Sequence, residues 1–174
     1  ADVVLGPEMK STGEVMGIAN NFPGAYAKTQ AAVDMELPKT GTCFLSVCDR
    51  DKRAILPLAR DLARMGFKLI CTSGTARALE SANIPCEVIG RVSDPEPNIA
   101  TLIGEGKIDL MINTPFGQET RSDGYVLRTL AVRQNLCYVT TLAGAQAFVS
   151  AIDNLRDDNL PIIALQDLDQ WEEK

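Results

Sequence analysis

The turn Thr72-Ser73-Gly74-Thr75 has the residue types in this sequence that best suit the binding of an anion. An apolar run precedes it and a helix-forming run follows, so it is predicted to join a strand to a helix. Gly74 permits a close approach of the backbone. Free amides of Gly74, Thr75 and Ala76 at the helix N-terminus would attract an anion, as would the helix dipole. The turn lacks the lysine of a Walker loop, and Thr72 or Ser73 as a simple N-cap is an equally good interpretation of the turn alone.

Two cations and two polar side chains follow other predicted strands. Lys52 comes after the first strand, Arg91 after the third, and Asn113 with Thr114 at the end of the fourth. Ligands of doubly wound sheets bind outside the carboxyl ends of the strands, so these residues and the turn together resemble a phosphate cradle. The amide of Asn113 suits a base or ribose edge. Taken singly, the cations could be solvated surface charges, and Asn113 a turn residue before Pro115.

The sequence offers no convincing general acid–base pair or metal site. It contains no histidine, which is the commonest general base and metal ligand. Asp49 and Asp51 flank the end of the first strand, and Asp123 is expected to open a helix as a dipole-stabilised cap. These residue types favour binding over turnover, with no catalytic residue.

Composition and charge limit the class of protein. The 174 residues are 45% hydrophobic and 23% charged, which is typical of a soluble globular protein. The net charge of −6 argues against nucleic acid or an anionic membrane as the main partner. No apolar run approaches the ~18 residues of a membrane span, and no signal-peptide pattern is present. The five cysteines lack CxxC spacing, so we expect buried, reduced thiols in a cytoplasmic protein.

Hydrophobic periodicity predicts the elements that position these residues. Strands are expected at 43–49, 67–71, 86–89, 109–113 and 136–141, with helices at 52–66, 75–83, 98–105, 122–134 and 145–155. Such alternation with short loops predicts right-handed βαβ units and a parallel sheet that is covered on both faces. The fold class is therefore α/β, a doubly wound (Rossmann/flavodoxin-like) three-layer sandwich with about five parallel strands. A short helix at 22–33 and a linker at 34–41 precede it, and an apolar segment at 160–165 follows it.

Several motifs resemble the C-terminal end of the carbamoyl phosphate synthetase large subunit. GPEMKSTGEVMG (6–17) is similar to the close of that subunit's second ATP-grasp synthetase domain. FLSVCDRDK, ICTSGTARAL, DLMINTP, RSDGYVLR and VTTLAGAQA resemble its allosteric domain, which has a methylglyoxal-synthase-like fold. The resemblance divides the chain into residues 1–40, the tail of the synthetase domain plus linker, and residues 41–174, the allosteric domain.

The resemblance implies regulation. The parent enzyme is an ATP-dependent ligase that makes carbamoyl phosphate from bicarbonate, glutamine-derived ammonia and ATP for pyrimidine and arginine biosynthesis. Its ATP and Mg or Mn ions belong to synthetase domains that this chain mostly lacks, so neither ligase activity nor a cofactor is expected here. The effector is UMP or IMP in many bacterial enzymes and N-acetylglutamate in the urea-cycle enzymes. Expected partners are the synthetase domains, the glutaminase small subunit through the parent enzyme, and further copies of the chain.

The family's contacts carry over position by position. The predicted effector-binding residues are Lys52, Thr72, Ser73, Gly74, Thr75, Arg91, Asn113 and Thr114. Arg91 stands where the best-known pattern has lysine, which keeps the charge but changes the geometry. Pro115 replaces a threonine contact, so one hydroxyl is lost. Tyr138 and Thr140 match positions where the family's ornithine site touches this domain.

Three alternatives share the fold. A methylglyoxal synthase-like lyase would need catalytic aspartates, a histidine and a GPLGGD-like loop after the fourth strand, where this chain has NTPFGQ. The purine-biosynthesis enzyme with inosine monophosphate cyclohydrolase activity would need a lysine- and histidine-bearing segment in place of RVSDPEPN. A module that serves only oligomerisation would bind no ligand, and only the co-location of the predicted site residues argues against it.

Overall fold

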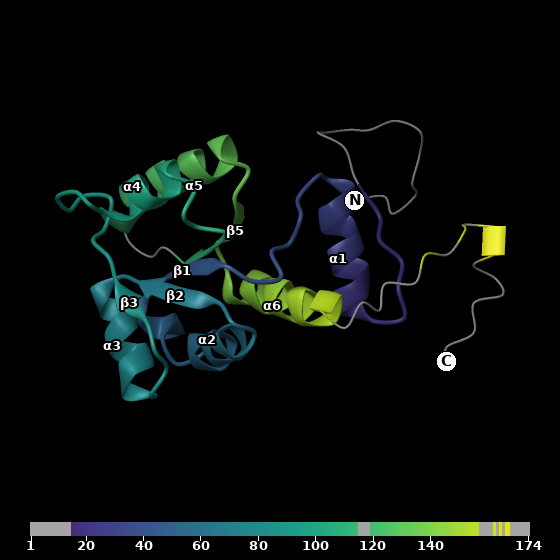
Figure 1. The fold of residues 1–174 in the computed structure, drawn as a ribbon, viewed down its shortest axis with the longest axis horizontal. Coiled ribbons are helices and arrows are strands. Elements are labelled where there is room, and N and C mark those ends of the chain that lie inside the picture. Colours follow the sequence, from purple (N-terminus) through teal and green to yellow (C-terminus); the bar gives the residue numbers. More distant parts are fainter. Residues whose placement is uncertain (1–14, 115–118, 157–161, 163, 165, 168–174) are drawn as a thin grey trace.

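The protein forms a five-stranded parallel sheet with helices on both faces (Figure 1). The computed structural model describes residues 15–114, 119–156, 162, 164, 166 and 167. In chain order the elements are α1 (Phe22–Ala32), β1 (Thr42–Val47), the 3₁₀ turn η1 (Asp49–Asp51), α2 (Ile55–Arg64), β2 (Lys68–Cys71), α3 (Ser73–Ser81), β3 (Glu87–Val88), α4 (Ile99–Gly104), β4 (Leu110–Thr114), α5 (Glu119–Arg133), β5 (Cys137–Val139) and α6 (Leu142–Arg156). The predicted doubly wound α/β fold is confirmed.

The strand order locates the site. The strands run β3-β2-β1-β4-β5, and every pair is parallel. The chain thus builds outward from β1 to β3 and then returns to place β4 on the other side of β1. The register sets Ser46 opposite Asn113 and Val47 opposite Thr114, so the two central strands end together. Ligands of open α/β sheets bind at this switch point.

The helices form two layers, one on each face of the sheet (Figure 1). One core cluster joins α2, α3 and α6 to side chains such as Leu45 and Ile112. The other joins α4 and α5 to Phe44 and Met111. Neighbouring residues of β1 and β4 therefore enter opposite cores. Both faces are buried, which explains why these strands read as continuous apolar runs.

Several element ends differ from the predicted ones. The helix after β2 begins at Ser73 instead of residue 75, and α5 begins at Glu119 instead of residue 122. The helix expected from Lys52 begins at Ile55, because a 3₁₀ turn follows β1. Strand β3 is reduced to Glu87–Val88. Periodicity reports which face of an element is buried, whereas local capping and turn geometry decide where it starts.

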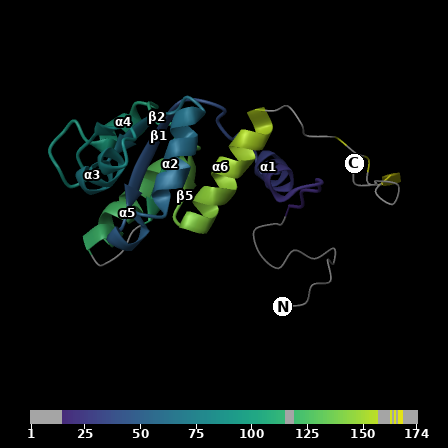
Figure 2. The same ribbon diagram turned by 90° about the horizontal axis from the view of Figure 1, so that it is seen from below.

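Helix α1 packs against α6, beside the layer that α6 shares with α2 and α3 (Figure 2). Tyr26 meets Phe148 edge to face, with ring centroids 5.7 Å apart. The division at residues 40 and 41 stays a prediction. Residues 6–14 of the head motif, and most of the apolar segment 160–165, lie outside the described residues.

The predicted linker is fastened to the domain along its length. Leu37 is 8% exposed and belongs to the core cluster of the α6 face. The Cys137 thiol donates to the Glu36 carbonyl at 3.3 Å, and Arg156 Nη1 donates to the Lys39 carbonyl at 3.1 Å. Side-chain burial and hydrogen bonds to β5 and α6 therefore hold this segment in place.

The five cysteines are free thiols; Cys43, Cys71 and Cys137 are buried as predicted, whereas Cys48 and Cys86 are only half-buried. Burial raises the pKa of the Cys43 and Cys71 thiols, and raises that of Cys137 to about 11. Among the described residues, no three cysteine or carboxylate side chains gather as a metal site would require. None of the helices in the described ranges has the length and apolar composition needed to cross a membrane.

Candidate functional site

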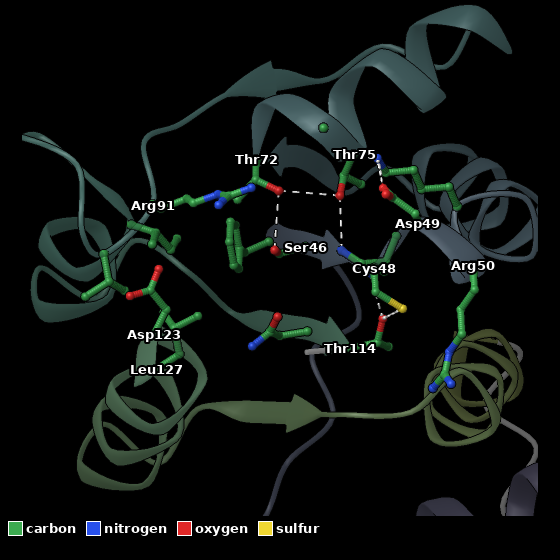
Figure 3. Close-up of a pocket in the computed structure, with 17 residues that line it drawn as sticks. Ser46, Cys48, Asp49, Arg50, Thr72, Thr75, Arg91, Thr114, Asp123 and Leu127 are labelled. Carbon is green, nitrogen blue, oxygen red and sulfur yellow. Dashed lines mark hydrogen bonds and ion pairs between the residues drawn. The ribbon is translucent and has the colours of Figure 1, made fainter. Parts of the chain in front are cut away.

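A cavity of about 530 Å³ opens at the carboxyl ends of β1, β2 and β4 (Figure 3). This volume lies within the range of roughly 300–1,000 Å³ that is usual for small-molecule sites. The strand ends, the N-terminus of α3, the loop after β3, and helices α4 and α5 line it. Its lining includes seven of the eight predicted effector-binding residues: Lys52, Thr72, Gly74, Thr75, Arg91, Asn113 and Thr114. The structure therefore brings together residues that lie on four separate segments of the chain.

The two threonines of the turn are buried beside the end of β1. Thr75 is fully buried, and its Oγ1 accepts a hydrogen bond from the Val47 amide at 3.0 Å. Thr72 Oγ1 lies 3.4 Å from Thr75 Oγ1 and 3.3 Å from Ser46 Oγ (Figure 3). Thr72 occupies the N-cap position of α3, yet its side chain makes no capping hydrogen bond. The interpretation of this hydroxyl as a simple N-cap is therefore wrong.

The first turn of α3 leaves two amides available. The amides of Thr75 and Ala76 both donate to the Thr72 carbonyl at 2.9 Å, so the expectation that these two amides are free is wrong. Within the described residues, the amides of Ser73 and Gly74 have no hydrogen-bond partner. Unbonded amides at a helix N-terminus carry partial positive charge and favour an anion.

The Lys52 ammonium completes a cationic corner of the cavity. A Cβ atom added to Gly74 would lie only 3.3 Å from Lys52 Nζ, so the ammonium sits directly against the start of α3. Lys52 Nζ also pairs with Asp49 Oδ1 at 2.5 Å. The hydrogen bond from Lys52 and its charge lower the pKa of the Asp49 carboxyl. The absence of a side chain at Gly74 keeps the ammonium and the helix amides within reach of one ligand group.

A second group of contacts joins the ends of β1 and β4. The Cys48 amide donates to both the carbonyl and Oγ1 of Thr114, at 3.2 Å each. The Cys48 thiol donates to Asp51 Oδ2 at 3.1 Å. Desolvation raises the pKa of Asp51, but hydrogen bonds from Cys48 and Thr114 and the charge of Arg50 outweigh it, and the net pKa is lowered. These contacts fix the width of the crevice at the switch point.

The opposite end of the cavity combines polar groups with an apolar wall. Asn113 is only 6% exposed, and its side-chain amide finds no hydrogen-bond partner among the described residues. The Arg91 side chain reaches toward Thr72 from the loop after β3, and Asp123 comes from α5 (Figure 3). Asp123 Oδ2 accepts a hydrogen bond from Ser93 Oγ at 3.3 Å. The apolar wall consists of Phe44, Val92, Ile99 and Leu127.

Sequence reasoning missed this wall and misjudged Asp123. Because α5 begins at Glu119, Asp123 lies in its second turn and lines the cavity instead of capping the helix. The spacing of Asp123 and Leu127, one helical turn apart, was the available signal. An apolar residue at a strand end, such as Phe44, is indistinguishable in sequence from an ordinary core residue.

Three predicted residues lie outside the cavity lining. Ser73 is exposed, although its amide belongs to the first turn of α3. Tyr138 is half-buried and packs against the core of the α4 and α5 layer, and Thr140 is half-buried just after β5. The predicted ornithine contacts of Tyr138 and Thr140 stay predictions.

Comparison with known proteins adds a family to this geometry. A family model described as "MGS-like domain" matches residues 54–140, which is half of the chain and includes all of the predicted site residues except Lys52. The chain belongs to the MGS-like domain family. Its matched segment runs from the start of α2 to the end of β5, so this MGS-like domain includes four of the five strands of the sheet.

Relatives of this MGS-like domain are described as carbamoyl phosphate synthase large chains or their C-terminal sections. "Carbamoyl phosphate synthase large chain, C-terminal section" from Methanopyrus kandleri is 51% identical over 96% of this chain and 31% of its own length. The protein of the same description from Methanocaldococcus jannaschii is 44% identical over 97% of this chain and 27% of its own length. "Carbamoyl phosphate synthase large chain" from Methanobrevibacter smithii is 45% identical over 96% of this chain and 16% of its own length. The predicted resemblance is confirmed, and this chain spans less than a third of the length of these curated relatives.

Proposed function

We propose that the cavity binds a nucleoside monophosphate, UMP or IMP, and that this MGS-like domain thereby regulates a carbamoyl phosphate synthase large chain. The observation that carries the proposal is the meeting of seven predicted residues in one cavity at the switch point. The ligand's phosphate would lie in the corner formed by Lys52 and the amides of Ser73 and Gly74. Charge-assisted hydrogen bonds of this kind are the strong ones, and a helix N-terminus suits phosphate.

The two unlike ends of the cavity support a nucleotide over a bare anion. The apolar wall that includes Phe44 and Leu127 can cover one face of a base, because it offers buried apolar surface beside polar groups. Asn113 supplies a buried amide with both donor and acceptor atoms for a base or ribose edge. The Asp123 carboxylate can accept hydrogen bonds from ribose hydroxyls.

Regulation requires contact with the rest of the large chain. We place that contact on the exposed apolar residues before and at the start of α1, namely Val15, Met16 and Phe22. Large exposed apolar side chains that lie together on a surface mark an interaction site. An effector that binds two arrangements of the domains with unequal affinity would shift their equilibrium. The same proposal includes carbamoyl phosphate synthesis by the parent enzyme, with ATP and Mg or Mn ions in its synthetase domains. It also includes the small subunit as a partner and a cytoplasmic location.

Isothermal titration calorimetry of the purified chain with UMP, IMP and N-acetylglutamate tests the ligand. We expect saturable heat with a nucleotide. Absence of heat with both nucleotides, together with binding of N-acetylglutamate, would overturn the nucleotide proposal in favour of the alternative effector. Incubation with dihydroxyacetone phosphate tests the lyase alternative, and formation of methylglyoxal by the pure protein would contradict the regulatory role.

A further inference from the structure

The cation that would hold the effector's phosphate already has an anionic partner on its own chain. Lys52 Nζ lies 2.5 Å from Asp49 Oδ1, across the 3₁₀ turn that follows β1. The Lys52 side chain is 28% exposed and is held at the cavity, whereas that of Asp49 is 94% exposed. Figure 3 shows Asp49 at the Thr75 side of the cavity, where a dashed line marks its ion pair. The carboxylate can therefore leave the lysine without loss of packing, while the ammonium stays at the site.

The position of the pair makes it relevant to the ligand. The ammonium abuts Gly74, next to the two unbonded amides of α3. A phosphate group that reaches these amides also reaches Lys52 Nζ, where it meets the Asp49 carboxylate. Two anionic groups at one ammonium repel each other.

We propose that Asp49 is an internal competitor of the effector, so that its carboxylate and the ligand's phosphate exchange at the Lys52 ammonium. The inference rests on the proposed binding of a phosphorylated ligand in this cavity. Asp49 then sets the affinity of the site, because every binding event must break the same ion pair. A purely orienting role for Asp49 would have the opposite sign, since an unpaired Lys52 would be less well placed for the ligand.

The substitution Asp49→Asn tests the two roles by calorimetry with UMP and with inorganic phosphate. Exposed ion pairs contribute modestly, so we expect D49N to bind about 1.4- to 5-fold more tightly than the wild type. The gain should be larger for phosphate at pH 7.5 than at pH 5, because the dianion is repelled more strongly than the monoanion by the carboxylate that D49N removes.

Asp61→Asn is the matched control. Asp61 pairs with Arg64 at 3.3 Å with the same i,i+3 spacing, and it lies outside the cavity lining. D61N changes the net charge equally and should leave both affinities at the wild-type value. Equal or weaker binding by D49N, or the same gain in D61N, would overturn the competitor role.

Carboxyl ¹³C NMR of Asp49 gives a second measurement. Saturation with UMP should raise the pKa of Asp49, because the phosphate replaces the Asp49 carboxylate at Lys52. The charge of Arg77, which also lowers this pKa, remains nearby, so the rise should be partial. An unchanged Asp49 pKa would contradict displacement. If the wild type and D49N bind neither probe, the proposed function fails; if the wild type binds UMP and D49N shows no gain, the competitor role alone fails.

Discussion

The substitution Gly74→Ala should make the protein more stable and its site weaker. Gly74 lies in the first turn of α3, and its φ is not in the left-handed region. An added Cβ would meet only the flexible end of Lys52, at 3.3 Å from Nζ and 3.9 Å from Cε. Replacing a compatible glycine by alanine stabilises by about 0.4–1 kcal/mol. For a chain of this length we expect the Tm to rise by about 1–4 °C.

Ligand binding by this variant should change in the other direction. The methyl group would cover the amides at the start of α3 and push the ammonium away from them. Complete loss of a hydrogen bond to a charged group costs about 1.5–3 kcal/mol, and each 1.4 kcal/mol is about a factor of ten. We therefore expect the affinity for UMP to fall about ten-fold or more in calorimetry.

Gly104→Ala provides the matched control for this pair of measurements. Gly104 ends α4, is exposed, and has no atom within 4 Å of an added Cβ. It should raise the Tm without any change in UMP affinity. Unchanged UMP binding by G74A would refute the placement of the phosphate at this turn, and a lower Tm would refute the claim that the glycine serves the ligand instead of the fold.

Three further substitutions test the site and the core. Thr75→Val leaves the buried Val47 amide without its acceptor and should lower the free energy of unfolding in urea by about 1–3 kcal/mol. Thr129→Val, at a half-buried residue whose hydrogen bond to the Tyr125 carbonyl is exposed, should cost less than about 0.5 kcal/mol; equal losses would contradict the buried bond. Lys52→Met should weaken UMP binding by about 10- to 150-fold, and Lys107→Met, which breaks an exposed ion pair outside the cavity, should leave it unchanged. Burial raises the pKa of the Cys43 thiol above its ordinary 9.0. The stability that the buried neutral thiol contributes is therefore complete below pH 9 and is lost as the pH rises further. The urea midpoint should fall between pH 8 and pH 10 by less in Cys43→Ala than in the wild type, and an identical fall would refute this linkage.

The sequence predicted the sheet and most of the rim of the cavity. Parallel strands buried on both faces leave long apolar runs, and polar residues such as Lys52 and Asn113 stand out directly after or at the end of these runs. The switch-point rule then locates polar strand ends beside one another without any knowledge of side-chain positions. The turn at Thr72 stands out because hydroxyls and a glycine at the start of a helix suit an anion, although an N-cap is an equally good interpretation of the turn alone.

Other parts of the site depend on atomic geometry that sequence does not encode locally. Of the two unbonded amides, that of Gly74 was predicted but that of Ser73 was not, and those of Thr75 and Ala76 were wrongly included, because the α3 boundary lies two residues before the predicted one and the Thr72 carbonyl takes the next two amides. The sequence placed Asp49 only at the end of the first strand, and it is the 3₁₀ turn that sets its carboxylate against Lys52. Packing of α1 on α6 joins residues more than 100 positions apart, so no local pattern predicts it.

The segment between α1 and β1 has a mechanical consequence. A flexible Gly/Ser-rich linker would not transmit a displacement between the elements that it joins. In this segment, however, Leu37 is buried in the core, and Cys137 and Arg156 donate hydrogen bonds to the backbone carbonyls of Glu36 and Lys39. A small shift of β5 or α6 must therefore carry α1 with it. The segment would therefore pass a displacement of the domain on to α1 and to the exposed side chains of Phe22 and Met16, instead of absorbing it.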